Sequence, residues 1–249
     1  MTRREKCDLL RRLHTDPQLL VLVNAWDVAS ARAVAAVPGC RAVATASHSV
    51  AAAHGYDDGE QIPLPLMIAA VARIAAAVDL PVTADLEAGY GDAGATTRQA
   101  IEAGAVGCNL EDAMGDPEVT ARAVAAARDA GATAGVPLVI NARTDTHLVD
   151  TGLAGAARVA EAIRRGRRYL AAGADCVFVP ACTDPAEITE LVAAFGPGRL
   201  SLLGVPGLAE PGELQRLGVA RVSYGPYPQR WAMAALTERA TQLLAGGAR

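Results

Sequence analysis

The stretch ADLEAGYGD, residues 84–92, sets two carboxylates and a glycine-rich turn directly after the apolar run LPVT, residues 80–83. Asp85 and Glu87 are two residues apart, so on a β-strand both side chains leave the same face. Like charges that share a strand face repel each other and lose hydration unless a cation or hydrogen-bond donors compensate. A divalent metal ion is the simplest compensation, and the alternative is that the acids cap the next helix or meet arginines. The glycines allow a sharp turn and a close approach of a ligand. The stretch therefore predicts a metal site at the carboxyl end of a strand.

On either side of this stretch, short apolar runs alternate with longer, alanine-rich amphipathic runs. The expected strands are residues 20–25, 41–46, 80–86, 106–111, 137–143, 175–180, 200–205 and 220–224. The expected helices are residues 3–14, 28–37, 64–78, 94–103, 117–131, 153–172, 185–194, 210–217 and 228–245. Eight βα units with no linker or composition break predict one domain, residues 1–249, folded as a (β/α)8 TIM-type barrel. A doubly wound open sheet is the runner-up, but NAWD, residues 24–27, stands where its glycine motif would follow the first strand.

Composition restricts the classes of function. Hydrophobic residues make up 51% of the chain and charged residues 20%, which is typical of a soluble globular protein. The net charge of −4 indicates no nucleic-acid partner. No apolar stretch has the length of a membrane span, and the first ten residues lack a signal core, so we expect no membrane partner and a cytoplasmic location. The only lysine is Lys6, in the polar amino-terminal segment, which disfavours Schiff-base chemistry, pyridoxal phosphate and a Walker-type phosphate loop.

Four carboxylates from separate segments can converge at the carboxyl ends of the strands, where barrels of this type carry out their chemistry. These four expected metal-site residues are Asp58, Asp85, Glu87 and Glu111. All-oxygen ligation suits Mg²⁺ or Mn²⁺, and because Mg²⁺ keeps several waters, only one or two acids need to bind it directly. Zinc is disfavoured, because the four histidines lack the i, i+4 spacing of a helical zinc motif.

Two basic side chains have open interpretations. Arg143 follows an apolar strand, where a buried guanidinium needs an anionic partner. That partner is either a carboxylate substrate bound in bidentate geometry or a salt bridge to Glu111 or Asp145. His48 is the histidine at a strand end, and it is either part of the site or an ordinary hydrogen-bonded side chain.

Five ordered motifs resemble the isocitrate lyase/phosphoenolpyruvate mutase superfamily, and in particular its short bacterial members. They are NAWDVASAR (24–32), ATASHSVAAAHGYDDGE (44–60), ADLEAGYGD (84–92), NLED (109–112) and INARTD (140–145). The resemblance covers about residues 20–225. It implies a barrel whose Asp85 binds Mg²⁺ directly, while Glu87, Glu111 and Asp58 hold metal-bound waters.

The resemblance also implies how a small carboxylate substrate binds. The backbone around Ala46, Ser47 and His48 matches the loop that binds the substrate's carboxylate or oxyanion, and Arg143 matches the substrate-binding arginine. We assign catalytic roles to Arg143, Asp58 and Glu111. We assign substrate contacts to Ala46, Ser47, His48, Asp85, Arg143, Tyr90 and Trp26.

This sequence differs from the pattern of the resembled superfamily at the catalytic lid. The resembled lyases carry a lid after the fourth strand with a cysteine, lysines and a histidine, and the mutases carry lysine and asparagine there. Here the segment is AMGDPEV, residues 113–119, which has no lysine, cysteine or histidine. Mutases also have a histidine after the sixth strand, where this chain has Pro180. The usual general acid and base of both groups are therefore missing.

The implied activity is a Mg²⁺-dependent lyase. It would cleave a C–C bond or decarboxylate a small 2-oxo acid or hydroxy-di- or tricarboxylate through a metal-stabilised enolate. One alternative is C–P chemistry on phosphonopyruvate or phosphoenolpyruvate, as a mutase or hydrolase. Another is a non-catalytic protein that binds metal and oxo acid.

The last expected helix, residues 228–245, carries several apolar side chains. In the resembled superfamily this helix is exchanged between subunits, which implies a homodimer or homotetramer. The sequence alone equally allows a helix packed on its own barrel.

Overall fold

The computed structural model describes residues 1–246. Its strands form one parallel sheet in the order β1-β9-β8-β7-β6-β5-β4-β3-β2. The strands are β1 (Leu20–Leu22), β2 (Asn24–Ala25), β3 (Val43–Thr45), β4 (Val82–Asp85), β5 (Gly107–Glu111), β6 (Val139–Arg143), β7 (Cys176–Phe178), β8 (Leu200–Leu203) and β9 (Arg221–Ser223).

The sheet is a barrel whose first strand is divided in two. β1 pairs with β9 and β2 pairs with β3, and only Val23 separates them along the chain. The pair β1 and β2 therefore closes the ring as a single expected strand, residues 20–25. The predicted (β/α)8 barrel is confirmed, with eight strand positions and nine assigned strands in residues 1–246.

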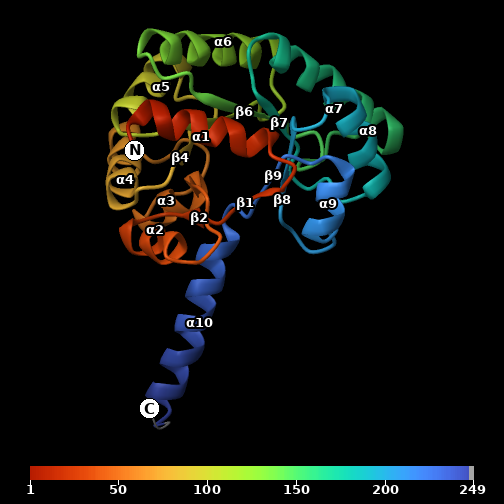
Figure 1. The fold of residues 1–249 in the computed structure, drawn as a ribbon. Helices are drawn as coiled ribbons and strands as arrows, with labels where there is room; N and C mark the ends of the chain where they lie inside the picture. Colours follow the sequence, from red (N-terminus) through yellow and green to blue (C-terminus); the bar gives the residue numbers. More distant parts are fainter. Residues whose placement is uncertain (247–249) are drawn as a thin grey trace.

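Most of the helices cover the outside of the barrel (Figure 1). The helices of residues 1–246 are α1 (Arg3–Thr15), α2 (Val28–Ala35), α3 (Ser47–Ala53), α4 (Leu64–Ala77), α5 (Ala93–Glu102), α6 (Pro117–Thr133), α7 (Gly155–Ala171), α8 (Pro185–Phe195), α9 (Pro211–Leu217) and α10 (Tyr227–Leu244). Aspartates cap α2, α5, α6 and α8, because each side chain accepts a hydrogen bond from a first-turn N–H. α3 was not expected, since the seven-residue helix has no capping side chain at Ala46 to mark its start.

α1 covers the amino-terminal end of the barrel. Cys7, Leu10 and Leu13 are buried in the largest core cluster, together with residues of β4, β5 and β6. The Cys7 thiol donates to the carbonyl of Pro137, just before β6, and a Cβ at Gly107 would lie 2.7 Å from Leu10 Cδ2. The opposite end, where the strands terminate, is therefore the end left for a site.

α10 extends away from the barrel (Figure 1). Pro228 is its one buried residue within the described chain, and Trp231, Leu236 and Leu244 are exposed. The alternative of a last helix packed on its own barrel is therefore wrong. Within residues 1–246, no helix combines the length and apolar character needed to cross a membrane.

Candidate active site

A cavity of about 270 Å³ opens among the carboxyl ends of the strands. It brings together six of the expected site residues, which are Ala46, Ser47, His48, Asp58, Asp85 and Arg143. The residues come from the ends of β3, β4 and β6, from the start of α3, and from the loop that follows α3. Of the four expected metal-site acids, Asp58 and Asp85 line this cavity, whereas Glu87 and Glu111 do not.

Asp85 is the last residue of β4 and is fixed by the start of α3. Ser47 donates to Asp85 Oδ2 twice, from its backbone N–H at 3.1 Å and from its hydroxyl at 2.9 Å. Ser47 Oγ is also 3.4 Å from Asp58 Oδ1, but one hydroxyl proton can serve only one acceptor, and the shorter contact is to Asp85. In residues 1–246, Asp85 Oδ1 accepts no hydrogen bond, so this oxygen is available to a ligand at the cavity.

Glu87 is buried beside Asp85 and is held by two donors. The Tyr90 hydroxyl donates to Oε1 at 2.9 Å, and the backbone N–H of Glu60 donates to Oε2. Burial raises the pKa of Glu87 above its ordinary value, the two donors oppose the rise, and the negative charge of Asp85 adds to it. Glu87 has a φ of 52°, in the left-handed region that few non-glycine residues adopt. The turn thus places a carboxylate where its ionisation is costly.

Glu111 and Arg143 face each other across β5 and β6, where they are register partners. Arg143 Nη1 lies 2.7 Å from Glu111 Oε2, and Arg143 Nε lies 2.5 Å from Asp145 Oδ1. The expected alternative for Arg143, a salt bridge to Glu111 or Asp145, is therefore present with both acids. The Arg143 side chain also lines the cavity. Burial raises the pKa of Glu111 to about 8; Arg143 opposes the rise, and the charges of Asp85, Asp145 and Glu87 add to it.

The donor set of the site fits a hard divalent cation. Asp85, Glu87, Glu111 and Asp58 offer only oxygen, and the charges of neighbouring acids add to the rise in pKa that burial causes at the two glutamates. Among residues 1–246, no three of these acids bring their oxygens within 4.8 Å of one another. The arrangement therefore suits an ion that Asp85 contacts directly and that the other acids reach through water, which is the way Mg²⁺ is commonly bound.

His48 and Asp58 form the more exposed side of the cavity. His48 Nδ1 lies 3.6 Å from Asp58 Oδ2, and the side chains are 39% and 52% exposed. His48 is in the first turn of α3, where the N-cap residue Ala46 supplies no side-chain cap and Asp85 accepts from the Ser47 N–H. The N–H groups of His48 and Ser49 have no acceptor in the described residues, so they are available to an anion.

Two expected substrate contacts lie outside the cavity. Tyr90 uses its hydroxyl on Glu87, and Trp26 packs with Tyr90 against Val50 and Met67. Trp26 also lines a separate cavity with His54 and Arg73. The Ser30 hydroxyl accepts from the backbone N–H of Trp26 where the chain enters α2.

Other cavity residues were not expected as site residues. Asn24, Asn109, Tyr227 and Arg230 line the cavity. Asn24 Oδ1 accepts from the backbone N–H groups of Tyr224 and Gly225 at 2.9 Å and 2.8 Å, which ties the first strand to the loop after β9. Arg230 comes from the first turn of α10, and the position of Arg230 soon after the last strand was the signal available in the sequence.

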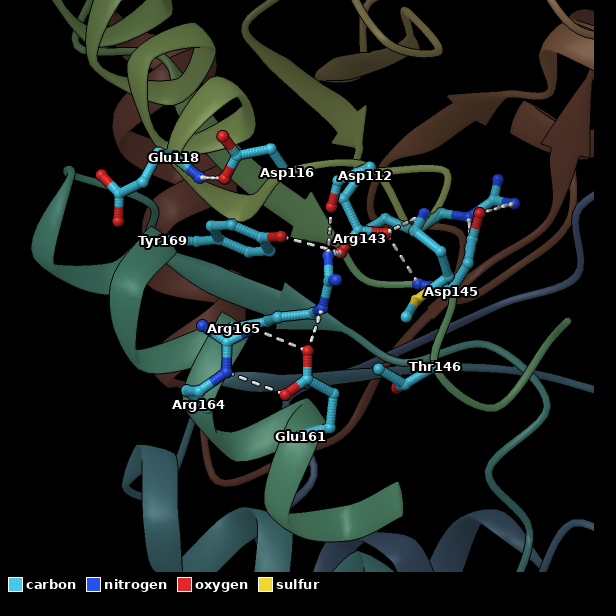
Figure 2. A network of polar contacts seen from close by, with 12 residues as sticks. Asp112, Asp116, Glu118, Arg143, Asp145, Thr146, Glu161, Arg164, Arg165 and Tyr169 are labelled. Atoms are coloured by element: carbon cyan, nitrogen blue, oxygen red, sulfur yellow. Dashed lines mark hydrogen bonds and ion pairs between the residues drawn. The ribbon is translucent and has the colours of Figure 1, made fainter. Parts of the chain in front are cut away.

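In the segment expected at the position of the lid, residues 113–119, the first residues form a hydrogen-bonded turn. Asp112 Oδ2 accepts from the Tyr169 hydroxyl at 2.7 Å and from Arg165 Nη1 at 3.0 Å (Figure 2). Asp112 Oδ1 accepts from the backbone N–H groups of Met114 and Asp145. Arg165 also donates to the Gly115 carbonyl at 2.8 Å. A buried aspartate and arginine thus hold the turn against α7, and sequence reasoning assigned no role to this network.

The fold and the site define a class, a (β/α)8 barrel with an acid-rich cavity at the carboxyl ends of its strands. The profile of the family described as phosphoenolpyruvate phosphomutase matches residues 10–244. The chain belongs to this family, within the isocitrate lyase/phosphoenolpyruvate mutase superfamily expected from the five motifs.

Three relatives illustrate the range of the family. A solved structure from Burkholderia cenocepacia J2315, described as a "putative phosphonomutase", is 43% identical with a TM-score of 0.90, covering 99% of this chain and 100% of that chain. An uncharacterised protein of Mycobacterium tuberculosis is 36% identical over 87% of this chain and 81% of its own length. An oxaloacetate decarboxylase of Ectopseudomonas mendocina is 31% identical over 69% of this chain and 61% of its own length. The superfamily thus includes both lyases and mutases.

Proposed function

We propose that the protein is a Mg²⁺-dependent lyase that cleaves or decarboxylates a small 2-oxo acid. One observation carries the proposal: Asp85, held by Ser47, lines the same cavity as Arg143 and as His48 in the first turn of α3. A site for a cation and two groups suited to a carboxylate therefore share one space. The 31% identity to an oxaloacetate decarboxylase supports this class of substrate.

Each residue has a defined part in this proposal. Asp85 would contact the ion, and Glu87, Glu111 and Asp58 would hold its waters. When bound, the divalent ion supplies Lewis-acid stabilisation of negative charge that develops on the substrate. Arg143 and the first-turn N–H groups of α3 orient the substrate carboxylate. His48 Nδ1, beside Asp58, is placed to deliver a proton to the product.

The turn at residues 113–116 favours decarboxylation or simple C–C cleavage over the reactions of relatives that carry a catalytic lid. Residues 113–116 contain no lysine, cysteine or histidine, and their contacts with Arg165 and Asp112 hold them in place. Loss of CO₂ needs fewer proton transfers than an isocitrate lyase reaction, so it tolerates the missing lid residues better.

C–P chemistry on a phosphonate is the second candidate. It needs cations around a phosphoryl group, and the cavity offers Arg230 in addition to Arg143. The 43% identity to the Burkholderia structure supports this candidate. Arg143 is already paired with two acids, which leaves Arg230 as the main phosphoryl contact.

The test is calorimetry with Mg²⁺, oxaloacetate, pyruvate and phosphonopyruvate, followed by product detection. We expect Mg²⁺-dependent oxo-acid binding and release of CO₂ or a cleaved acid. Turnover of phosphonopyruvate alone would favour the second candidate, and binding without any product would favour a non-catalytic binding protein. Asp85→Ala should abolish binding and turnover, while Asp57→Ala, at an exposed neighbour of Asp58, should preserve both. Unchanged ion binding in Asp85→Ala would overturn the proposal.

A further inference from the structure

Three side chains of types that commonly bind metal ions meet beside the active-site cavity. His147 lies in the loop after β6, Cys182 in the loop after β7, and Glu187 in the first turn of α8. One ligand atom of each lies within 4.8 Å of the other two, and this is the one such group in residues 1–246. None of the three lines the cavity of the candidate active site.

The distances within this trio fit a tetrahedral ion. His147 Nε2 lies 3.2 Å from Glu187 Oε2, and Cys182 Sγ lies 3.9 Å from the same oxygen. A zinc ion with ordinary bond lengths of about 2.0–2.3 Å separates its ligands by roughly 3.3–3.7 Å. Only small adjustments of the side chains are needed to reach these separations.

Hydrogen bonds to neighbouring residues use the second polar atoms of His147 and Glu187 and leave His147 Nε2 and Glu187 Oε2 for an ion. His147 Nδ1 lies 3.1 Å from Thr146 Oγ1, so a hydrogen on Nδ1 can be donated there while Nε2 keeps its lone pair. Arg158 Nη2 lies 3.3 Å from Glu187 Oε1, which leaves Oε2 for a ligand. Metal-binding histidines and carboxylates usually have such partners for their second atoms.

The burial of the trio also suits a structural ion. The His147 side chain is 1% exposed, Cys182 is 1% exposed, and the Glu187 side chain is 15% exposed. Sulfur, nitrogen and oxygen ligands together suit zinc and other borderline divalent ions rather than Mg²⁺. The trio is thus chemically distinct from the all-oxygen site at Asp85.

We propose that His147, Cys182 and Glu187 bind a zinc-class divalent ion, with water as the fourth ligand. On binding, the Cys182 thiol releases its proton to solvent, and the neutral imidazole binds through Nε2. The site joins the loop after β6 to the loop after β7. Leu148 and Pro180, which are close in sequence to two of the ligands, line the active-site cavity. The ion would therefore fix one wall of that cavity.

The test uses the full chain, dialysed against a chelator and then titrated with Zn²⁺ or Co²⁺. We expect one equivalent of Zn²⁺ to bind and raise the melting temperature, and Co²⁺ to give a near-ultraviolet thiolate charge-transfer band. Cys182→Ser should lose the band and the bound equivalent. Cys40→Ser, at a cysteine outside the trio, and Asp85→Ala should keep both.

Two further variants keep the test decisive if Cys182→Ser fails to fold. His147→Gln should also lose the bound equivalent. Thr146→Val keeps the side-chain shape but removes the partner of Nδ1, and should weaken Zn²⁺ binding by about 10-fold. A wild-type chain that takes up no stoichiometric Zn²⁺, or a cobalt band that persists in Cys182→Ser, would overturn the proposal.

Discussion

Arg143 shows how a single side chain can serve both the stability and the chemistry of the site. Its partners Glu111 and Asp145 are largely buried, so removing the guanidinium leaves two carboxylates without compensation. We expect Arg143→Met to lower the free energy of unfolding by about 3–5 kcal/mol. Because Mg²⁺ supplies positive charge nearby, it should restore part of this loss. Urea unfolding with and without Mg²⁺ measures both effects.

Arg164→Met is the matched control for this experiment. Arg164 pairs with Glu161 on the surface, with 58% of its side chain exposed, so the loss should be small. Equal stability of Arg143→Met and the wild type would show that the two acids do not depend on Arg143.

Tyr90 affects the site through Glu87. Tyr90→Phe removes the hydroxyl that donates to Glu87 Oε1 but keeps the ring that packs against Val50 and Met67. We expect Mg²⁺ affinity to fall by about 10-fold, since partners of metal-binding carboxylates have effects of this size. Calorimetry measures the change, and Tyr56→Phe, at an exposed tyrosine, is the control. An affinity equal to that of the wild type would remove Glu87 from the metal site.

Residues at strand ends could be predicted from the sequence, and residues brought in by other segments could not. Asp85 and Arg143 directly end apolar runs, so their position followed from the barrel rule. Arg230 reaches the cavity from a helix, and Trp26 lines a separate cavity. The trio of His147, Cys182 and Glu187 comes from three segments with no spacing motif, so local sequence gave no signal for it.

At the scale of elements, α1 makes the barrel sensitive to acid through His14. His14 is buried, its Nδ1 donates to the Leu10 carbonyl, and its Nε2 has no hydrogen-bond partner in the described residues. Burial lowers the pKa of His14 from 6.5 to about 4, and the positive charge of Arg221 adds to this shift. Between these two values the unfolded chain binds more protons than the folded one, so stability rises with pH.

We expect this histidine to cost the folded state about 3 kcal/mol as the pH falls from 7 to 4. Urea unfolding across this range should show the loss in the wild type, and His14→Leu should show a smaller one. His54→Leu is the control, because His54 makes the same kind of bond, to the Val50 carbonyl, but is exposed. Parallel pH profiles for the wild type and His14→Leu would contradict the prediction.

The main strands and helices were easier to predict than the short helix α3 and the interruption of the first strand. The eight strand positions followed from apolar runs, and capping aspartates marked the starts of α2, α5, α6 and α8. α3 has neither a side chain at its N-cap residue that caps it nor the length for a clear periodicity, so the sequence of residues 47–53 does not predict a helix. The interruption at Val23 depends on which neighbour each half of the strand pairs with, and only the closed barrel determines that.

At the scale of the whole molecule, we propose that α10 packs against a second copy of the chain. The large apolar side chains it exposes are Trp231, Met233, Leu236, Leu243 and Leu244. A lone projecting helix gains little stability by itself, and an exposed apolar surface of this kind is typical of an interface. Light scattering after size exclusion should give a dimer or tetramer for the wild type.

Charged substitutions on α10 test this assembly. Trp231→Glu combined with Leu236→Glu should yield monomers, whereas Val119→Glu, at an exposed valine of α6, should not change the mass. A wild-type chain that is monomeric at tens of micromolar would refute the assembly.

Because Arg230 belongs to α10, the assembly of subunits and the shape of the cavity wall are coupled. Its side chain borders the reaction cavity from the first turn of a helix that is exposed along most of its remaining described length. If subunit contacts fix the direction of that helix, dilution should alter the cavity wall as it separates the subunits. Specific activity should then fall as enzyme concentration decreases, with a midpoint at the dissociation constant of the assembly.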